Sequence, residues 1–425
     1  MAVPSKPLSD RLALLYHLSQ TFNSSLDLDE VLKRVMDEVI VATHAGRGFV
    51  MLVEPGSQAA GAGLVFRAAR GIDQETINDP QFQISRSVVE KVAREGQPML
   101  TSDAQRDERF SMRQSVLLLG LRSILCVPLI IKDRPLGVIY VDNHLRAGVF
   151  LQSDLELLTA IASSAAIAIE NARLYQVAVD KGRMEKELHL AHQVQVSLLP
   201  HQVPQLPGWD FAALWHPARE VSGDYYDFIE AEQGKLGLII ADVSDKGMPA
   251  ALFMALTRST VRASLKSTHS PASGIALANS LISADSTDGY FVTLFYALLD
   301  STTGDLTYVN AGHSPPLLYN AALNQFVILN RTGMALGVDE ASLYGQFTVH
   351  LDPGDFVLLY TDGVTEAANP QGNEFGIERL RRTAAYMQKA SAAEMATALE
   401  QAVCTFGGCD PLSDDITILA AKRLV

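Results

Sequence analysis

The sequence predicts an α+β protein with two domains joined by a long helix. Three observations lead to this fold class. The chain has 425 residues, which corresponds to about two or three domains of ordinary size. Short strand-like runs alternate with helix-like runs in both halves of the chain. Between the halves, a nearly continuous helical pattern covers residues 155–199.

The composition excludes several classes of protein. Hydrophobic residues make up 48% of the chain and charged residues 19%, so the chain can bury cores and is not disordered as a whole. The formal net charge of -14 repels a phosphate backbone, so we expect no nucleic-acid partner. Three cysteines are too few for a disulfide framework, and we expect buried or incidental thiols. Because no signal peptide and no run of about 18 uninterrupted apolar residues is visible, we expect a cytoplasmic protein without a membrane span.

The first domain is expected at residues 10–175. Residues 26–30 indicate the start of a helix, and apolar residues then follow at helical spacing. Strand-like runs cover residues 49–53, 64–68, 123–131 and 136–141. Residues 132–135 predict a hairpin turn between the last two strands. No catalytic motif is present in this part of the chain.

Four segments of this domain resemble the GAF family of ligand-sensing domains. They are residues 122–129 (RSILCVPL), 136–143 (LGVIYVDN), 150–160 (FLQSDLELLTA) and 166–172 (AIAIENA). The resemblance implies a six-stranded antiparallel sheet with flanking helices and a pocket on one face. It also implies a small-molecule or protein activator, whose identity the motifs leave open. Cys126 lies in a strand and is expected to be a core thiol.

The long helical pattern carries a stripe of apolar or small residues spaced by three and four. The stripe consists of Ile161, Ala165, Ala168, Ala172, Tyr175 and Val179. Its phase breaks at Lys181 and Gly182, where a hinge or stutter is expected because glycine costs about 1 kcal/mol in a helix interior. We expect a parallel coiled coil in a homodimer. The alternative is one long helix that packs on its own two domains.

The second half of the chain carries four acidic clusters next to apolar strand-like runs. They lie at residues 222–227, 242–245, 362 and 414–415. A single aspartate at a strand end usually starts a turn or caps a helix. Several that converge would repel one another unless hard divalent cations neutralise them, and all-oxygen sites suit Mg²⁺ or Mn²⁺. Two such ions can hold a phosphoryl group for in-line attack. The spacing alone does not separate a phosphatase from a nuclease or a cyclase.

Six motifs in this half resemble the SpoIIE/RsbU-type branch of the PPM family, the metal-dependent serine/threonine protein phosphatases. They are residues 220–228 (EVSGDYYDF), 241–247 (ADVSDKG), 291–296 (FVTLFY), 308–317 (YVNAGHSPPL), 360–367 (YTDGVTEA) and 413–417 (SDDIT). Residues 187–200 resemble the helix that precedes this catalytic domain. The family resemblance implies an αββα sandwich, in which two antiparallel sheets lie between outer layers of helices.

The resemblance also implies a role for each matching carboxylate. By motif position, Asp242 bridges two Mn²⁺ or Mg²⁺ ions, assisted by the backbone carbonyl of Val243. Asp224 binds one ion, and Asp362 and Asp414 bind the other. A water molecule between the ions attacks phosphoserine or phosphothreonine directly, so no activated serine is needed.

Other residues near these carboxylates also have expected roles. Asp227 and Asp415 are second choices for direct ligation and fit equally well as groups that orient waters or the ligating carboxylates. Arg219 could clamp the substrate phosphate. His313 could be a general acid, although we favour a structural histidine that anchors a turn.

The sequence departs from the family pattern at two places. Ser222 precedes Gly223 where a glycine pair is often seen, and both Ser222 and Ser244 are expected to be turn residues. Asp245 stands where a glycine is common and adds negative charge beside the expected metal site. Neither change removes a carboxylate, so we expect an active enzyme.

The leading hypothesis is a sensor-regulated phosphatase with a sensor at 10–175, a helical linker at 176–200 and a catalytic domain at 201–425. By family analogy, its substrate is a phosphorylated anti-sigma-factor antagonist, a STAS-domain protein of a bacterial stress or developmental pathway. One alternative is a catalytically silent scaffold that senses a ligand and binds a phosphoprotein or sigma-factor regulator. Another is a metal phosphohydrolase that acts on small molecules or nucleotides.

Overall fold

The structure of the protein is a computed structural model. It describes residues 8–54, 63–71, 84–101, 122–144, 147–231, 234–286, 289–407 and 412–425. The chain divides into two compact units, Met1–Arg183 and Met184–Val425.

The first unit is an antiparallel sheet with helices on both faces. Its strand order is β2-β1-β5-β4-β3. The strands are β1 (Arg47–Val53), β2 (Leu64–Gly71), β3 (Met99–Thr101), β4 (Ser123–Ile131) and β5 (Arg134–Asn143), and the helices are α1 (Leu8–Phe22), α2 (Leu28–Thr43), α3 (Arg86–Glu95) and the first part of α5 (Gln152–Leu198). Among the described residues the sheet has five strands, one fewer than the GAF resemblance implies, and residues 72–83 and 102–121 lie outside the described part.

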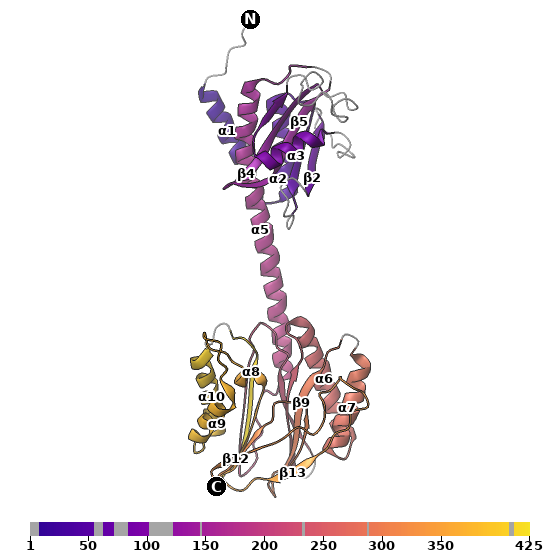
Figure 1. Ribbon diagram of the computed structural model, residues 1–425, viewed down its shortest axis with the longest axis vertical. Helices are drawn as coiled ribbons and strands as arrows, with labels where there is room; N and C mark the ends of the chain where they lie inside the picture. The colour runs from indigo at the N-terminus through magenta and orange to yellow at the C-terminus, as the bar shows by residue number, and fades with distance from the viewer. Residues whose placement is uncertain are drawn as a thin grey trace. The chain divides into compact units, whose positions relative to one another are not determined.

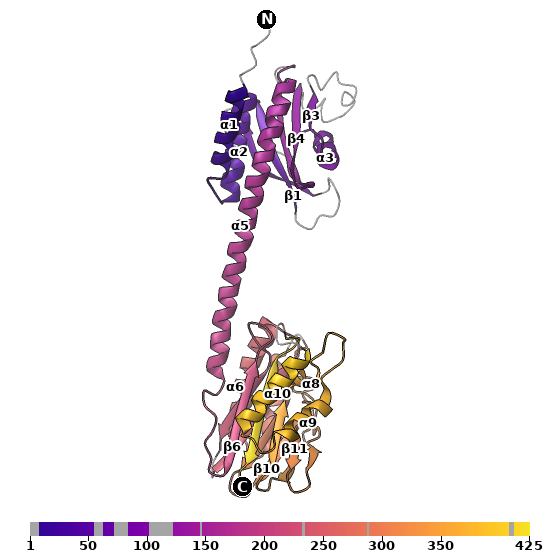
Figure 2. The ribbon, with the colours of Figure 1, turned by 90° about the vertical axis from the view of Figure 1, so that its left-hand side faces the viewer.

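Local sequence explains the main elements of this unit. The Asp27 side chain caps α2 by accepting a hydrogen bond from the backbone N–H of Glu30, as the acidic helix start predicted. Lys132 and Asp133 both adopt positive φ, which gives the tight turn that joins β4 to β5. Helices α1, α2 and α5 cover one face of the sheet and α3 covers the other (Figure 2). The unit therefore has two separate apolar cores, one on each face.

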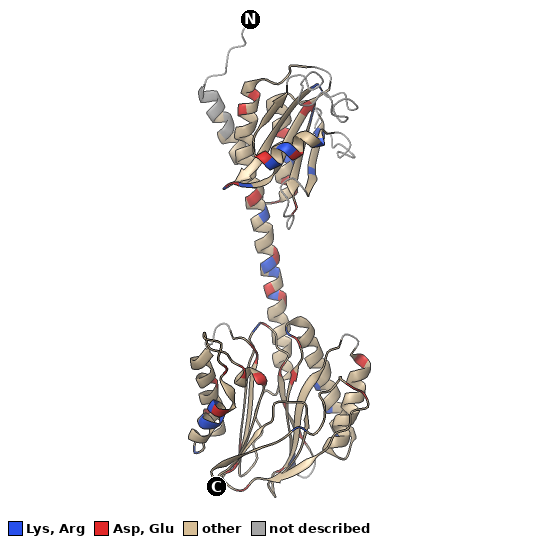
Figure 3. Cartoon of the chain, viewed as in Figure 1, with Lys and Arg blue, Asp and Glu red and all other residues tan. Residues whose placement is uncertain are grey.

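Helix α5 runs from Gln152 to Leu198 without interruption, so Gly182 does not break it. Ile161, Ala165, Ala168 and Ala172 are buried in the core of the first unit. This corrects the expected coiled-coil stripe, because these four residues are not available to a second chain. Residues 174–187 are exposed, and positively and negatively charged residues are interspersed along this stretch (Figure 3).

Among the described residues, α5 is the one helix long and apolar enough to cross a membrane by length and composition. However, 44% of its apolar window is buried inside the structure. Core helices of folded domains have the same property.

The second unit is an αββα sandwich, as the phosphatase resemblance implied. Its two antiparallel sheets have the orders β13-β10-β9-β8-β7 and β12-β11-β14-β15-β6. The strands are β6 (Trp209–His216), β7 (Tyr225–Glu230), β8 (Lys235–Val243), β9 (Val292–Asp300), β10 (Asp305–Ala311), β11 (Leu317–Asn320), β12 (Gln325–Ile328), β13 (Phe347–His350), β14 (Phe356–Tyr360) and β15 (Ile416–Arg423). The helices are α6 (Met248–Ser267), α7 (Pro271–Asp285), α8 (Asp362–Thr365), α9 (Gly376–Tyr386) and α10 (Ala392–Gly407).

Three apolar layers hold the sandwich together. The central layer lies between the sheets, and the outer layers lie beneath α6 and α7 on one side and beneath α9 and α10 on the other (Figure 1). Along β8, Leu238 and Ile240 face the central layer while Ile239 and Ala241 face α6. This alternation explains why the strand is apolar on both faces. The two-domain α+β prediction is confirmed.

The cysteines differ from one another. Cys126 is buried and free, and burial raises the pKa of its thiol, as expected of a core residue. Cys404 is disulfide-bonded. This corrects the expectation that all three cysteines are thiols. Cys409 lies outside the described residues.

Two glycines give opposite predictions for stability. A Cβ at Gly137 would clash with the backbone carbonyl of Met51, whereas a Cβ at Gly182 would meet nothing within 4 Å. We expect Gly137→Ala to destabilise the first unit by about 3 kcal/mol. We expect Gly182→Ala to stabilise α5 by about 1 kcal/mol. Urea denaturation of the full chain measures both, and equal effects of the two substitutions would contradict the close packing of β5 on β1.

Candidate active site

Four predicted carboxylates lie at one end of the sandwich. Asp224 immediately precedes β7 and Asp242 is near the end of β8, and these strands are paired. Asp362 begins α8 directly after β14, and Asp414 shortly precedes β15. Strands β14 and β15 are neighbours in the other sheet. The four side chains therefore come from the matching ends of two strand pairs, one in each sheet.

Hydrogen bonds across the sandwich fix Asp224. The hydroxyls of Thr361 and Thr417 donate to its Oδ2 at 2.8 and 2.7 Å. The indole N–H of Trp215 donates to its backbone carbonyl at 3.0 Å. The side chain is buried, and this burial, together with the nearby Asp242, raises the pKa of Asp224 well above its usual range. Asp224 is thus held rigidly in a position where its negative charge is costly.

The other carboxylates repel one another. Burial, followed by the charge of Asp362, raises the pKa of Asp242 to about 7. Burial and the charge of Asp414 raise the pKa of Asp362. Such mutual repulsion is a property of sites that hold cations.

The set of donors fits hard divalent cations, because every side-chain donor is a carboxylate oxygen. Nevertheless, within the described residues, no three carboxylate, histidine or cysteine side chains already converge as a metal-binding group. Instead, Lys246 lies beside Asp414, with its Nζ 2.9 Å from Oδ2. It also donates to the backbone carbonyl of Ser413. Lys246 was not singled out from the sequence, although it lies within one of the six family motifs.

The two second-choice aspartates have other partners. Asp227 is buried between two arginines of α6, with Arg262 at 3.0 Å and Arg258 at 3.4 Å, so it joins α6 to β7. Asp415 accepts hydrogen bonds from the Ser222 hydroxyl and from the backbone N–H groups of Ala218 and Gly223. It therefore shapes the loop that carries Asp224.

The glycines and serines of the motifs have structural roles. A Cβ at Gly223 would lie 3.1 Å from the Val243 carbonyl, so a larger residue there would crowd the approach of the loop to β8. Ser222 donates to Asp415, and the Ser244 hydroxyl accepts from the backbone N–H of Phe291. Both serines are thus turn residues. Asp245 adopts a φ of 74°, a left-handed conformation that glycine adopts most easily.

His313 and Arg219 lie in contrasting environments. His313 is buried, and burial lowers its pKa to about 4. Its Nε2 contacts the Tyr360 carbonyl at 3.2 Å and its Nδ1 contacts the Thr293 hydroxyl at 2.9 Å. A carbonyl can only accept, so Nε2 donates and Nδ1 accepts, as in a neutral structural histidine. Arg219 is exposed.

The end of α5 is bonded directly to this site. Gln195 is buried, and its side-chain amide donates to the Ser222 carbonyl at 2.8 Å and accepts from the Ser222 N–H at 3.1 Å. His192 stacks on Trp215 with ring centroids 5.6 Å apart. Trp215 in turn donates to the carbonyl of Asp224. Sequence reasoning missed these contacts, since glutamine and tryptophan carry no motif signal for this role.

Comparisons with known proteins agree with this architecture. Residues 232–424 match the model of the family described as Stage II sporulation protein E (SpoIIE), and residues 25–170 match that of the GAF domain. The phosphoserine phosphatase RsbU of Bacillus subtilis is 32% identical over 244 residues, which cover 57% of this chain and 71% of that protein.

Two further similarities come from another curated protein and a solved structure. Protein IcfG of Synechocystis is 32% identical over 272 residues, or 58% of this chain and 43% of IcfG. The SiaA-PP2C domain of Pseudomonas aeruginosa has a similar fold, with a TM-score of 0.51 and 24% identity over 58% of this chain and 98% of that one. The carboxylate-lined sandwich, the GAF match and the extent of the RsbU match lead to one conclusion. The chain belongs to the SpoIIE/RsbU-type family of serine/threonine protein phosphatases.

Proposed function

We propose that this chain is a cytoplasmic, sensor-regulated, metal-dependent phosphatase that hydrolyses phosphoserine or phosphothreonine in a partner protein. The observation that supports it best is the group of mutually repelling carboxylates at the matching ends of two sheets. The proposed sensor covers residues 10–175, the linker 176–200 and the catalytic domain 201–425.

The proposed cofactors are two Mn²⁺ or Mg²⁺ ions. Asp242 would bridge them, with the Val243 carbonyl assisting, while Asp224 would hold one ion and Asp362 and Asp414 the other. When bound, the ions would activate water and neutralise charge on the phosphoryl group. The chain's own groups prepare this site, because Thr361 and Thr417 orient Asp224. Lys246 partly neutralises Asp414 before a cation arrives.

The proposed substrate is a phosphorylated STAS-domain anti-sigma-factor antagonist of a stress or developmental pathway. The name of RsbU, a phosphoserine phosphatase, supports the phosphoserine part of this proposal. Arg219 is the proposed phosphate clamp. Its exposure leaves its guanidinium accessible to a substrate.

The proposed regulation acts through α5. Gln195 binds both backbone groups of Ser222, two residues before Asp224. Any shift or rotation of this end of α5 would therefore move the loop that carries Asp224, a proposed metal ligand. An activator at the sensor would favour one of two positions of the helix.

The proposed homodimer uses an apolar stripe on the exposed part of α5. Its heptad positions are Leu174, Val177, Lys181, Met184, Leu188 and Ala191, of which Lys181 is the one charged residue. It continues through Lys181 without a phase break. Tyr175 and Val179 belonged to the expected stripe. Tyr175 lies beside this seam, and Val179 lies on the opposite side of the helix.

Loss of the proposed bridging carboxylate tests the enzyme assignment. We expect Asp242→Asn in the full chain to reduce Mn²⁺-dependent phosphate release from a phosphoserine protein by more than about a hundredfold. Even outer contacts to metal ligands are commonly worth tenfold to a hundredfold. Asp245→Asn, the control on the same loop, should retain most of the turnover. Turnover that persists in Asp242→Asn contradicts the assignment. Absence of both turnover and Mn²⁺ binding in the unaltered chain favours the alternative of a catalytically silent scaffold.

Replacement of Gln195 tests the proposed link between α5 and the site. Gln195→Ala removes two hydrogen bonds to the Asp224 loop, so we expect turnover to fall at least about tenfold. The control is Gln193→Ala, because Gln193 is exposed on the same helix and contacts His189. Phosphate release and unfolding free energy should both be measured for each variant. Equal turnover in the two variants would show that α5 does not position the loop.

Charge introduction on α5 distinguishes the two possible dimer seams. We expect the pair Leu174→Asp and Val177→Asp to convert a dimer into a monomer, since buried charges oppose coiled-coil packing. Val179→Asp, on the opposite side of the helix, should leave the dimer intact. Sedimentation measures both outcomes. If Val179→Asp is a monomer and the double variant is a dimer, the proposed seam is wrong and the stripe expected from the sequence is favoured.

A further inference from the structure

The first unit contains a pocket at the point where α5 leaves the sheet. Its volume is about 100 Å³. Its apolar lining includes Leu28 at the start of α2, Leu52 of β1, Leu136 of β5 and Ile169 of α5. All four belong to the core on the α2 and α5 face, or pack against it. The pocket is therefore separate from the core beneath α3 on the other face of the sheet.

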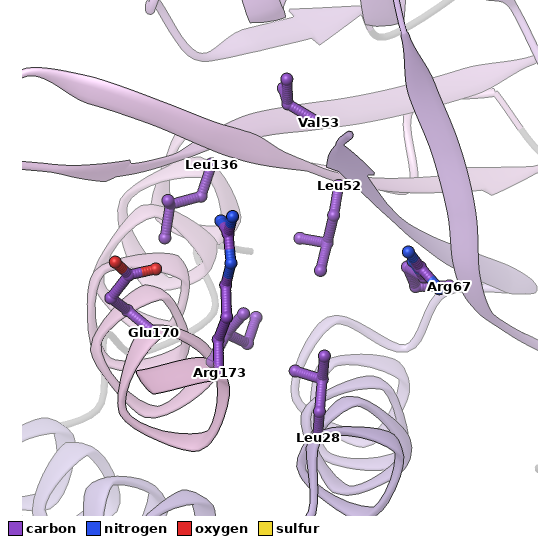
Figure 4. A pocket seen from close by; sticks show the side chains of 8 residues that line it. Leu28, Leu52, Val53, Arg67, Leu136, Glu170 and Arg173 are labelled. Carbon is purple, nitrogen blue, oxygen red and sulfur yellow. The ribbon is translucent and has the colours of Figure 1, made fainter. Parts of the chain in front are cut away.

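Three charged side chains complete the lining. They are Arg67 from β2, and Glu170 and Arg173 from α5. Arg173 lies between Glu170 and Leu52, and Arg67 lies on the other side of Leu52 (Figure 4). Two positive charges and one negative charge thus surround an aliphatic floor.

Within the described part of the chain, these charges are not used to hold the fold. None of the three side chains has a hydrogen bond or ion pair to another described residue. The Oε2 atom of Glu170 is buried without a hydrogen-bond partner. An unpaired buried polar atom is costly, so a donor from outside the chain would be stabilising there.

We propose that this pocket binds a small aliphatic α-amino acid. Its carboxylate would pair with the guanidinium group of Arg173, and the positive charge of Arg67 would add attraction from the far side of Leu52. Its ammonium group would donate to Glu170, and its aliphatic side chain would cover the leucines and Ile169. A simple carboxylic acid would leave Glu170 unpaired, and a simple amine would leave Arg173 unpaired. An amino acid is the smallest class of ligand that satisfies all three features.

The location gives the ligand direct access to the connecting helix. Glu170 and Arg173 belong to α5, whose far end carries Gln195. A role for the amino acid as an activating signal rests on the proposed function of the second unit. The binding itself does not, so a binding measurement can fail or succeed independently of phosphatase activity.

Calorimetric titration of the full chain with matched ligands tests the proposal. The first set is L-valine with two analogues: 3-methylbutanoate lacks the ammonium group, and isobutylamine lacks the carboxylate. The second set is L-leucine with its own two analogues, one without the ammonium group and one without the carboxylate. We expect one of the two amino acids to bind at least about tenfold more tightly than either of its analogues. Absence of binding by both amino acids, or equal binding of an amino acid and its carboxylic acid, overturns the proposal.

Three variants locate the binding in this pocket. We expect Arg173→Gln to weaken amino-acid binding at least about tenfold. Glu170→Gln should weaken binding of the amino acid more than binding of the carboxylic acid. Arg94→Gln, the control at an exposed position of α3, should change neither. Circular dichroism establishes that each variant is folded. If folded Arg173→Gln and Glu170→Gln both bind the amino acid as the unaltered chain does, the ligand lies elsewhere and the proposal is overturned.

Discussion

Repulsion between buried carboxylates is the constraint on which the second unit depends. Folding brings Asp224, Asp242 and Asp362 to the same end of two sheets, where burial and mutual charge raise their pKa values. The central apolar layer between the sheets offsets this cost. Divalent cations would remove the repulsion, so their binding is coupled to the arrangement of the whole site.

The same constraint explains why the surroundings of the site contain so many fixed contacts. Thr361 and Thr417 bind one oxygen of Asp224, and Asp415 fixes the preceding loop through three hydrogen bonds. Gln195 ties that loop to the end of α5. A helix that is bonded to a costly arrangement of charges can favour or oppose that arrangement with a small movement. This coupling is the physical basis of the proposed regulation at a distance.

The sequence predicted the fold class well, because motif order and strand periodicity are local signals. It ranked Asp224 above Asp227 through the family motif alone, and it gave no sign of the ion pairs that Asp227 forms with Arg258 and Arg262 of α6. The dimer stripe was placed on residues such as Ala165, whose spacing suits a coiled coil and a domain core equally well. The charged pocket joins residues from α2, three strands and α5, so no single segment carries its signal.

Calorimetric titration of the full chain with Mn²⁺ at pH 6 and pH 8, in buffers with different ionisation enthalpies, tests the central claim most directly. The pKa of Asp242 is raised to about 7 without cations, so at pH 6 a cation must displace a proton. If repelling carboxylates form the metal site, two ions bind, more tightly at pH 8 than at pH 6, with release of protons at the lower pH. Absence of Mn²⁺ binding, or an affinity that does not change with pH, would contradict that claim.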